Sequence, residues 1–307
     1  MNDAPAVDVV RGVRLQPDQA EPRASSLFAD YVELTKPRLN FLVVATSAAG
    51  YYLGAVGGVD VALMAQAVAG TALVAGGAAV LTPLYERDTD ALMRRTRMRP
   101  LPDGRVSPTD ARTFGIVLSA AGLLTLAART NWMAAALALA TLIVYLVVYT
   151  PMKRRTPQST LVGAIPGALP AIIGWTASHG SIALGGASLF AIVFLWQMPH
   201  FMAIAWLFRD DYGKAGFPML PVIEPGGTRA GRQALIYAAL LVPVSVTPTL
   251  IGIAGGTYFW VALVLGLAML GLAVRFATTR SDASARALFF GSITYLPLLW
   301  IALIANH

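Results

Sequence analysis

The chain of 307 residues contains no cysteine and few charged residues, and each shortage excludes a class of protein. Without cysteine, neither a disulfide framework nor a thiolate metal site can form. Charged residues make up only 13% of the chain, whereas soluble domains carry roughly 25%. Hydrophobic residues make up 56%, and the mean hydropathy is +0.63. This composition predicts a membrane protein.

Long apolar runs fill most of the sequence. A helix that spans a membrane needs about 20 predominantly apolar residues. We therefore predict an all-α polytopic membrane protein with nine transmembrane helices, at approximately 39–57, 61–83, 111–128, 132–150, 160–178, 184–207, 232–252, 257–277 and 285–305.

The basic residues support this count. If the nine spans alternate across the membrane, all of the 23 lysines and arginines except Arg129 fall on one side. Cytoplasmic loops carry the excess of lysine and arginine. We therefore predict a multi-pass protein of the cell (inner) membrane, with a cytoplasmic N-terminus and the C-terminus on the outer (periplasmic) side. The net charge of +7 then reflects topology, and we expect no nucleic-acid partner.

Two segments precede the first predicted span. Residues 1–26 are polar and lack the apolar core of a signal peptide, so we expect a flexible, uncleaved tail. In residues 27–36, Phe28, Tyr31 and Leu34 recur at helical spacing, which predicts a short amphipathic helix on the membrane surface. Residues 27–307 would then form a single domain.

The most highly charged stretch lies between residues 84 and 102. If the preceding span continues as a helix, Glu86 and Asp90 lie one turn apart on one face, at the membrane boundary. Carboxylates there could hold a divalent metal, and the arginines that follow could hold a diphosphate. The alternative is a charged loop that only fixes topology.

A similar loop follows the sixth predicted span. Asp210 and Asp211 precede a Pro-Met-Leu-Pro element at 218–221, much as the first acids precede the Pro-Leu-Pro element at 100–102. Two acid-bearing loops at one membrane face are typical of a metal–diphosphate site. A transporter repeat also fits the repetition, but it would favour an ionisable residue near the middle of the membrane, where the sequence places none.

Five stretches also carry a family resemblance. They are Leu34-Thr-Lys-Pro-Arg38, the acidic stretch from Glu86 to Gly104, Tyr149-Thr-Pro-Met-Lys-Arg154, the glycine- and proline-containing run 163–170, and Trp196-Gln-Met-Pro-His-Phe201 leading to Asp211-Tyr212. Together they resemble the UbiA prenyltransferase superfamily, and within it the protoheme IX farnesyltransferases. The Trp196–Phe201 element discriminates best, because benzoate- and quinone-type relatives usually carry an aspartate at the position of His200. Thr82 and Ser159 depart from the family, which usually has asparagine at both positions.

The resemblance implies a UbiA-type bundle with a central cavity that opens near the cytoplasmic face. It also implies transfer of a farnesyl group from farnesyl diphosphate to a vinyl group of protoheme IX (heme B), with addition of water, giving heme O for terminal oxidase biogenesis. Heme B is then a substrate, and a heme A synthase or terminal oxidase assembly factors are the expected protein partners. The alternative within the superfamily is an aromatic acid or quinone precursor as acceptor.

Residue roles follow from the resemblance. We expect the catalytic acids to be Glu86, Asp90, Asp210 and Asp211, with Mg²⁺ held by Glu86, Asp90 and Asp211. The expected diphosphate-binding residues are Arg87, Arg94, Arg95, Arg97, Arg99, Lys153 and Arg154, and the expected heme-binding residues are His200, Trp196 and Tyr149. Each has a plainer alternative: the basic residues also obey the topology rule, and a histidine or aromatic residue in an apolar helix usually serves packing.

Overall fold

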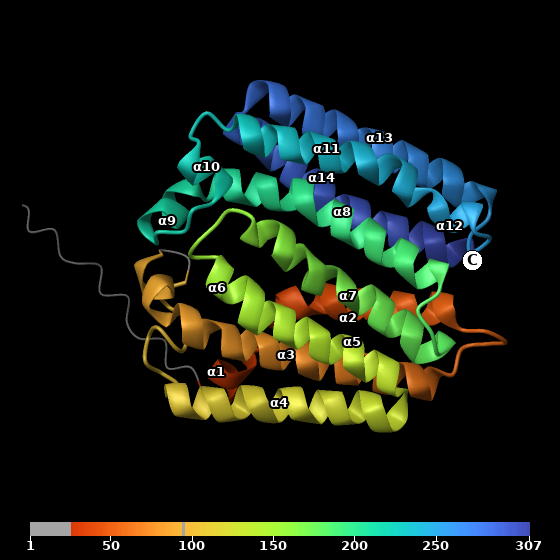
Figure 1. Ribbon diagram of the computed structural model, residues 1–307, viewed down its shortest axis with the longest axis horizontal. Helices are drawn as coiled ribbons and strands as arrows, with labels where there is room; N and C mark the ends of the chain where they lie inside the picture. Colours follow the sequence, from red (N-terminus) through yellow and green to blue (C-terminus); the bar gives the residue numbers. More distant parts are fainter. Residues whose placement is uncertain (1–25, 94–95) are drawn as a thin grey trace, which may run out of the picture.

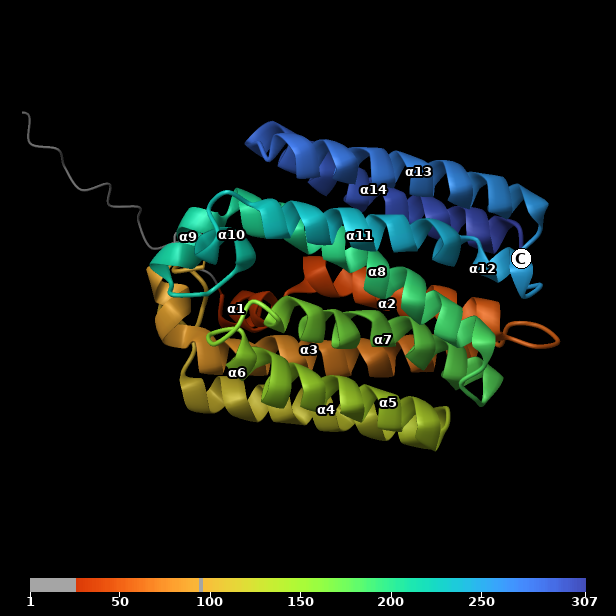
Figure 2. The same ribbon diagram turned by 45° about the horizontal axis from the view of Figure 1, so that its top comes forward.

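The computed structural model describes residues 26–93 and 96–307, which form a bundle of roughly parallel and antiparallel helices (Figures 1 and 2). Arg94, Arg95 and the predicted tail up to Ser25 lie outside the described residues. The helices are α1 (Leu27–Leu34), α2 (Pro37–Gly54), α3 (Val61–Leu92), α4 (Pro108–Arg129), α5 (Trp132–Ile143), the π-helix η1 (Val144–Tyr149), α6 (Thr150–Met152), α7 (Ser159–His179), α8 (Leu184–Leu207), α9 (Arg209–Lys214), α10 (Leu220–Ile223), α11 (Thr228–Ser245), α12 (Thr247–Leu250), α13 (Gly256–Thr279) and α14 (Asp282–Ala305).

Eight helical runs in the described part of the chain are long and apolar enough to cross a membrane. They correspond to the second to ninth predicted spans: α3, α4, the run Trp132–Met152, α7, α8, the run Thr228–Leu250, α13 and α14. The predicted first span is helix α2, whose 18 residues include Asn40, Thr46 and Ser47. These polar residues lower its hydropathy, and α2 is not among the eight. The all-helical, multi-pass membrane architecture is confirmed, whereas the count of nine spans is not.

Polar residues cap the N-termini of three of the long helices. The side chains of Asp60, Ser107 and Asn131 each accept a hydrogen bond from the amide three residues ahead, at the starts of α3, α4 and α5. Such caps satisfy amide groups that have no partner within the helix. Gly180 ends α7 in the left-handed conformation, which glycine adopts without steric cost. Asp60 and Asn131 thereby start α3 and α5 directly after the short connections from α2 and α4.

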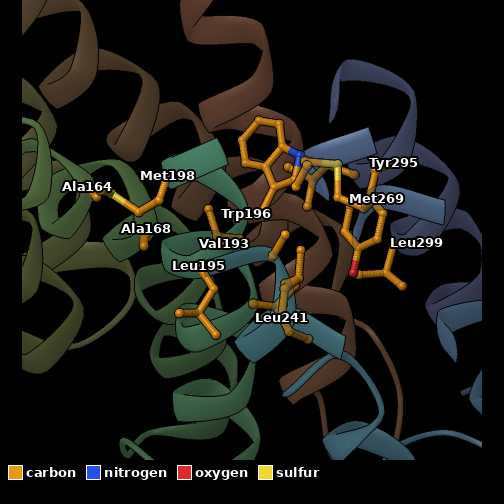
Figure 3. Close-up of a cluster of buried hydrophobic side chains, with 14 of the residues drawn as sticks. Ala164, Ala168, Val193, Leu195, Trp196, Met198, Leu241, Met269, Tyr295 and Leu299 are labelled. Atoms are coloured by element: carbon orange, nitrogen blue, oxygen red, sulfur yellow. The ribbon is translucent and has the colours of Figure 1, made fainter. Parts of the chain in front are cut away.

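A large apolar core joins α8 to the C-terminal helices. Leu189, Trp196, Leu241, Met269 and Leu296 are among its buried members, and Figure 3 shows side chains from α8, α11, α13 and α14 converging there. A smaller cluster joins the end of α3 to the α9–α10 region, where Met93 packs with Tyr212, Phe217 and Met219. The loop after α3 and the helices α9 and α10 therefore meet at one end of the bundle, opposite the C-terminus (Figures 1 and 2).

Helices α2 and α7 approach each other at glycines on both sides. A Cβ atom on Gly50 would lie 2.1 Å from the carbonyl oxygen of Ala171, and one on Gly174 would lie 1.9 Å from that of Ser47. Both of these oxygens are backbone atoms, so neither can move away by rotation of a side chain. The absence of side chains at these positions allows close backbone contact, as is common between helices in membranes.

We predict that Gly174→Ala destabilises the protein by about 1–3 kcal/mol, because the added methyl group must push α2 and α7 apart. Thermal unfolding in detergent measures the effect. Gly271→Ala is the matched control, since its Cβ would meet no atom within 4 Å, and alanine is the better helix former. A Gly174→Ala protein as stable as the Gly271→Ala protein would contradict this account of the contact.

Candidate active site

Helix α3 continues nine residues beyond its proline, Pro83, and carries the first acids on its last turns. Glu86 and Asp90 are buried, with exposed fractions of 5% and 1%, whereas Arg87 and Asp88 between them are exposed. The predicted one-turn spacing is confirmed: both carboxylates occupy the inward face of one helix.

Each buried carboxylate is paired with a cation. Lys153 Nζ, just after α6, lies 2.9 Å from Glu86 Oε1 and donates a hydrogen bond of 3.2 Å to Oε2. Arg99 Nη1, in the loop after α3, lies 3.2 Å from Asp90 Oδ2. Pairing is what makes buried carboxylates tolerable, because an isolated buried charge costs several kcal/mol. Burial alone would lower the pKa of Lys153, but Tyr149 and Glu86 raise it above its usual value, so this amine stays charged.

A third cation, Lys36, joins this group from the turn between α1 and α2. Sequence reasoning missed it as a site residue, although Lys36 belongs to the Leu34–Arg38 stretch that carries part of the family resemblance. Its φ of 51° is unusual for a residue other than glycine, and its side chain reaches the mouth of the cavity described below. Burial, and next the charge of Arg99, lower its pKa to about 8, although Glu86 and Asp90 act in the opposite direction.

An apolar cavity of about 430 Å³ extends from these charges into the bundle. Its walls come from α2, α3, α5, η1, α7 and α8, and its lining residues include Val43, Val74, Ala78, Ala138, Ile173, Phe201 and Ile204. Lys36, Lys153 and Tyr212 also line it and belong to the charged end. Its volume lies in the range of about 300–1,000 Å³ found for small-molecule sites.

The π-helix η1 places two tyrosines against this cavity. Tyr145 and Tyr149 both line it, with ring centroids 5.2 Å apart. Tyr149 fits there because Gly163 has no side chain: a Cβ would lie 2.6 Å from the Tyr149 ring. Short π-helical segments inside α-helices are frequent at functional sites. The structure thus brings Tyr149 to the cavity wall, close to the charged mouth.

The second pair of acids lies nearby on α9 but is less buried. Asp210 is exposed and Asp211 is half-buried, while the adjacent Tyr212 lines the cavity. Among residues 26–93 and 96–307, no group of three or more acids and histidines is close enough together to hold a metal ion. The metal set expected from sequence (Glu86, Asp90 and Asp211) is therefore not gathered in this structure.

The residues present nevertheless fit a hard divalent cation. Glu86 Oε1 is buried and accepts no hydrogen bond from the described residues, although Lys153 Nζ lies 2.9 Å away. Carboxylate oxygens are the ligands that Mg²⁺ prefers. Glu86 and Asp90 thus offer oxygen ligands beside the cavity mouth.

The remaining basic residues are distributed unevenly. Arg154 donates hydrogen bonds to the Tyr85 carbonyl (3.1 Å) and to Thr89 Oγ1 (3.3 Å), on the outer side of α3. Arg87 and Arg97 are exposed, and Arg94 and Arg95 lie outside the described residues. Of the predicted diphosphate-binding residues in the described part, Lys153 and Arg99 contact the buried acids.

His200 and Trp196 are not among the residues that line the cavity, and both contact Ser292 of α14. The Nδ1 atom of His200 lies 2.7 Å from Ser292 Oγ, and Trp196 Nε1 donates a 2.7 Å hydrogen bond to the Ser292 carbonyl. The Trp196 side chain lies among Met269 and Tyr295 (Figure 3). These contacts bind α8 to α14. A role of His200 and Trp196 in packing, the alternative to heme binding, predicts contacts of this kind. Of the three predicted heme-binding residues, only Tyr149 lines the cavity.

The two departures from the family pattern are both buried. The Thr82 hydroxyl donates a 2.8 Å hydrogen bond to the Ala78 carbonyl, within its own helix. Ser159 Oγ has no hydrogen-bond partner among the described residues.

These features define a class: a multi-pass membrane protein whose apolar cavity opens at paired buried acids and bases. The model of the UbiA prenyltransferase family matches residues 43–296, and the chain belongs to this family. A curated relative from Koribacter versatilis, named protoheme IX farnesyltransferase, is 43% identical, with 93% of this chain and 96% of the relative covered. One of the same name from Solibacter usitatus is 44% identical, with 88% and 96% covered.

Solved structures share the fold at lower identity. A structure described as that of digeranylgeranylglyceryl phosphate synthase has a TM-score of 0.78 at 16% identity, covering 91% of this chain and 98% of that one. A UbiA homologue from Archaeoglobus fulgidus, solved bound to GPP and Mg²⁺, has a TM-score of 0.64 at 21% identity, covering 90% and 99%. These likenesses place the helices of this chain in a UbiA-type bundle.

We predict that Lys153→Met destabilises the protein by about 3 kcal/mol, because it leaves Glu86 buried without a cation. Adding Glu86→Gln should recover most of this loss, since the glutamine is neutral. Chemical unfolding of both variants measures the coupling. Lys214→Met, an exposed substitution on α9, is the control and should change stability by less than about 0.5 kcal/mol. Equal stability of the single and double variants would contradict the pairing.

We also predict that, with Mg²⁺ present, binding of inorganic pyrophosphate at the mouth weakens as pH rises through about 8, the pKa of Lys36. Below that pH the amine is protonated and attracts the anion, whereas above it the amine is neutral. Lys36→Arg should remove this loss, because arginine stays charged. Calorimetric titrations of both proteins between pH 7 and 9 test this, and the ionisation of pyrophosphate itself affects both alike. Parallel pH profiles would contradict the role of Lys36.

Proposed function

We propose that the protein transfers the farnesyl group of farnesyl diphosphate to a vinyl group of protoheme IX, with addition of water, to give heme O. The observation that carries this proposal is an apolar cavity lined at its charged end by Lys36 and Lys153. Lys153 pairs with the buried Glu86, and one turn further along α3 Arg99 pairs with the buried Asp90. Membership of the UbiA prenyltransferase family supports prenyl transfer, and the names of the relatives at 43–44% identity support protoheme IX as acceptor.

The charged mouth binds the diphosphate. Lys153, Arg99 and Lys36 supply cations, and arginine can bind phosphate oxygens through two parallel hydrogen bonds. Arg87, Arg97 and Arg154 add positive charge nearby. Arg94 and Arg95, which lie outside the described residues, stay predicted diphosphate-binding residues. Glu86 and Asp90 would hold Mg²⁺. Asp211 and Asp210 on α9, which are not gathered with them in this structure, are the proposed further ligands. When bound, Mg²⁺ would neutralise charge that develops on the leaving diphosphate.

The cavity receives the farnesyl chain and the acceptor. Its apolar wall keeps water from the allylic cation that forms when the diphosphate departs. A vinyl group of the porphyrin attacks the first carbon of the farnesyl group, and the resulting cation is delocalised over the porphyrin. Tyr149 stands in the wall near the mouth, where it would contact the porphyrin. His200 and Trp196 stack behind the wall: the His200 ring lies 5.8 Å from that of Phe201, which does line the cavity.

In the proposed topology the mouth lies at the cytoplasmic face of the inner membrane, with the C-terminus on the periplasmic side. Farnesyl diphosphate, a soluble anion with an apolar tail, would then enter from the cytoplasm, and its diphosphate group would contact the basic residues at the mouth. The product would serve a heme A synthase or terminal oxidase assembly factors in the same membrane. Mg²⁺ is the proposed metal, and the Archaeoglobus fulgidus homologue was solved with Mg²⁺ bound.

We predict that membranes which contain heme B and no heme O acquire a hydroxyethylfarnesyl heme when the full chain is expressed in them. Extraction and mass spectrometry of the hemes provide the measurement. Asp90→Asn should reduce the product by about 100-fold or more, because it removes a charge that the transition state requires. Lys214→Met should leave the yield unchanged.

A folded, expressed protein that yields only unmodified heme B would exclude protoheme IX as the acceptor. A prenylated aromatic acid or quinone precursor in the same extract would then identify the alternative acceptor, with the mouth chemistry unchanged.

A further inference from the structure

Gln197 is an amide in the wall of the apolar cavity, in the middle of α8. Its side chain is 5% exposed and lines the cavity. The amide nitrogen donates hydrogen bonds to the carbonyl oxygens of Ala164 (3.2 Å) and Val193 (3.1 Å). Both amide hydrogens are therefore used, and the orientation of the amide group is fixed.

The other end of the amide has no such partner. Gln197 Oε1 accepts no hydrogen bond from the described residues, and it lies over Gly167 of α7. A Cβ atom on Gly167 would be only 2.1 Å from this oxygen. Gly167 also lines the cavity, so the missing side chain leaves room for a carbonyl oxygen at the cavity wall.

A second candidate acceptor belongs to Pro166, the residue that precedes Gly167. Pro170 has no N–H group, so the carbonyl oxygen of Pro166 lacks the donor that a helix normally supplies four residues ahead. Pro166 and Pro170 both line the cavity, and Pro166 precedes Gly167. Gln197 Oε1 and the Pro166 carbonyl are thus two acceptors on residues that line the cavity, and a buried water molecule needs about two to four polar partners.

We propose that Gln197 Oε1 and the Pro166 carbonyl hold the water molecule that adds in the last step of the reaction. The inference rests on the proposed function, because that reaction requires one water in an otherwise dry cavity. A water that donates both of its hydrogens to two fixed acceptors turns its lone pairs towards the cavity. Its oxygen forms the bond to the cationic carbon derived from the vinyl group, and the proton released passes to the departing diphosphate.

Whether this water is held decides which of two farnesylated hemes is formed. If no water is held, the same cation loses a proton instead and gives a farnesylated heme without the hydroxyl group. We expect Gln197→Met, which keeps the length of the side chain but has no acceptor oxygen, to raise the ratio of dehydrated to hydrated product about tenfold, as expected from the loss of one hydrogen bond. Gly167→Ala should produce the same shift, since its methyl group displaces the carbonyl oxygen.

The test is mass spectrometry of hemes made in H₂¹⁸O by the wild type, Gln197→Met, Gly167→Ala and the matched control Gln66→Met. Gln66 lies on α3 outside the cavity lining, so this control should give the wild-type ratio. ¹⁸O in the wild-type product, together with the shifted ratio in both cavity variants, supports the inference. If Gln197→Met does not fold, Gly167→Ala decides.

Two other outcomes distinguish a failure of the role of Gln197 from a failure of the proposed function. A wild type that makes hydroxyethylfarnesyl heme, with variants that are slower but keep the wild-type ratio, overturns the role of Gln197 and leaves the proposed function intact. A wild type that makes no farnesylated heme overturns the proposed function and this inference with it.

Discussion

The site depends on two buried ion pairs. Glu86 and Asp90 occupy the inward face of α3 beside an apolar cavity, where an unpaired carboxylate would be too costly to bury. Lys153 arrives from the end of the η1–α6 run and Arg99 from the loop after α3. The pairs therefore link three separate segments of chain at one mouth. Their geometry fixes the end of α3, and the end of α3 in turn packs through Met93 against the α9 region.

The cavity exists because the helices around it are irregular or lack side chains. Gly163 accommodates Tyr149, Gly167 accommodates Gln197, and the close contact of α2 with α7 is made on Gly50 and Gly174. The π-helix η1 widens the helix locally and turns its tyrosines inward. An ideal helix of large apolar residues would fill this space. Gly163 and Gly167, which line the cavity, thus shape its wall, whereas Gly50 and Gly174 set the distance between α2 and α7.

Sequence reasoning found most of the fold and part of the site, for physical reasons. Hydropathy located eight spans, because lipid demands long apolar helices, and only α3 runs far past its predicted end, by nine residues. The one-turn spacing predicted the shared face of Glu86 and Asp90. Sequence reasoning missed Lys36, because the position of its side chain depends on a left-handed backbone conformation. It also missed the unpartnered oxygen of Gln197, because the space for that oxygen depends on the absence of a Cβ atom at Gly167 on the neighbouring helix. His200 suggested heme binding through its chemistry, but its contact with Ser292 depends on α14, 92 residues away.

The pairing at the mouth also constrains how ligands can enter. Glu86 and Asp90 each already have a cation, and Lys153 and Arg99 each already have a carboxylate. A diphosphate alone would draw Lys153 and Arg99 away and leave two carboxylates unpaired, whereas a metal ion alone would leave two cations unpaired. Only the two together exchange partners without leaving a buried charge uncompensated, with the carboxylates turning to the metal and the cations to the phosphate. In the proposed reaction this charge balance would favour joint binding of metal and diphosphate over binding of either one, and the surplus charge of Lys36 would favour the anion.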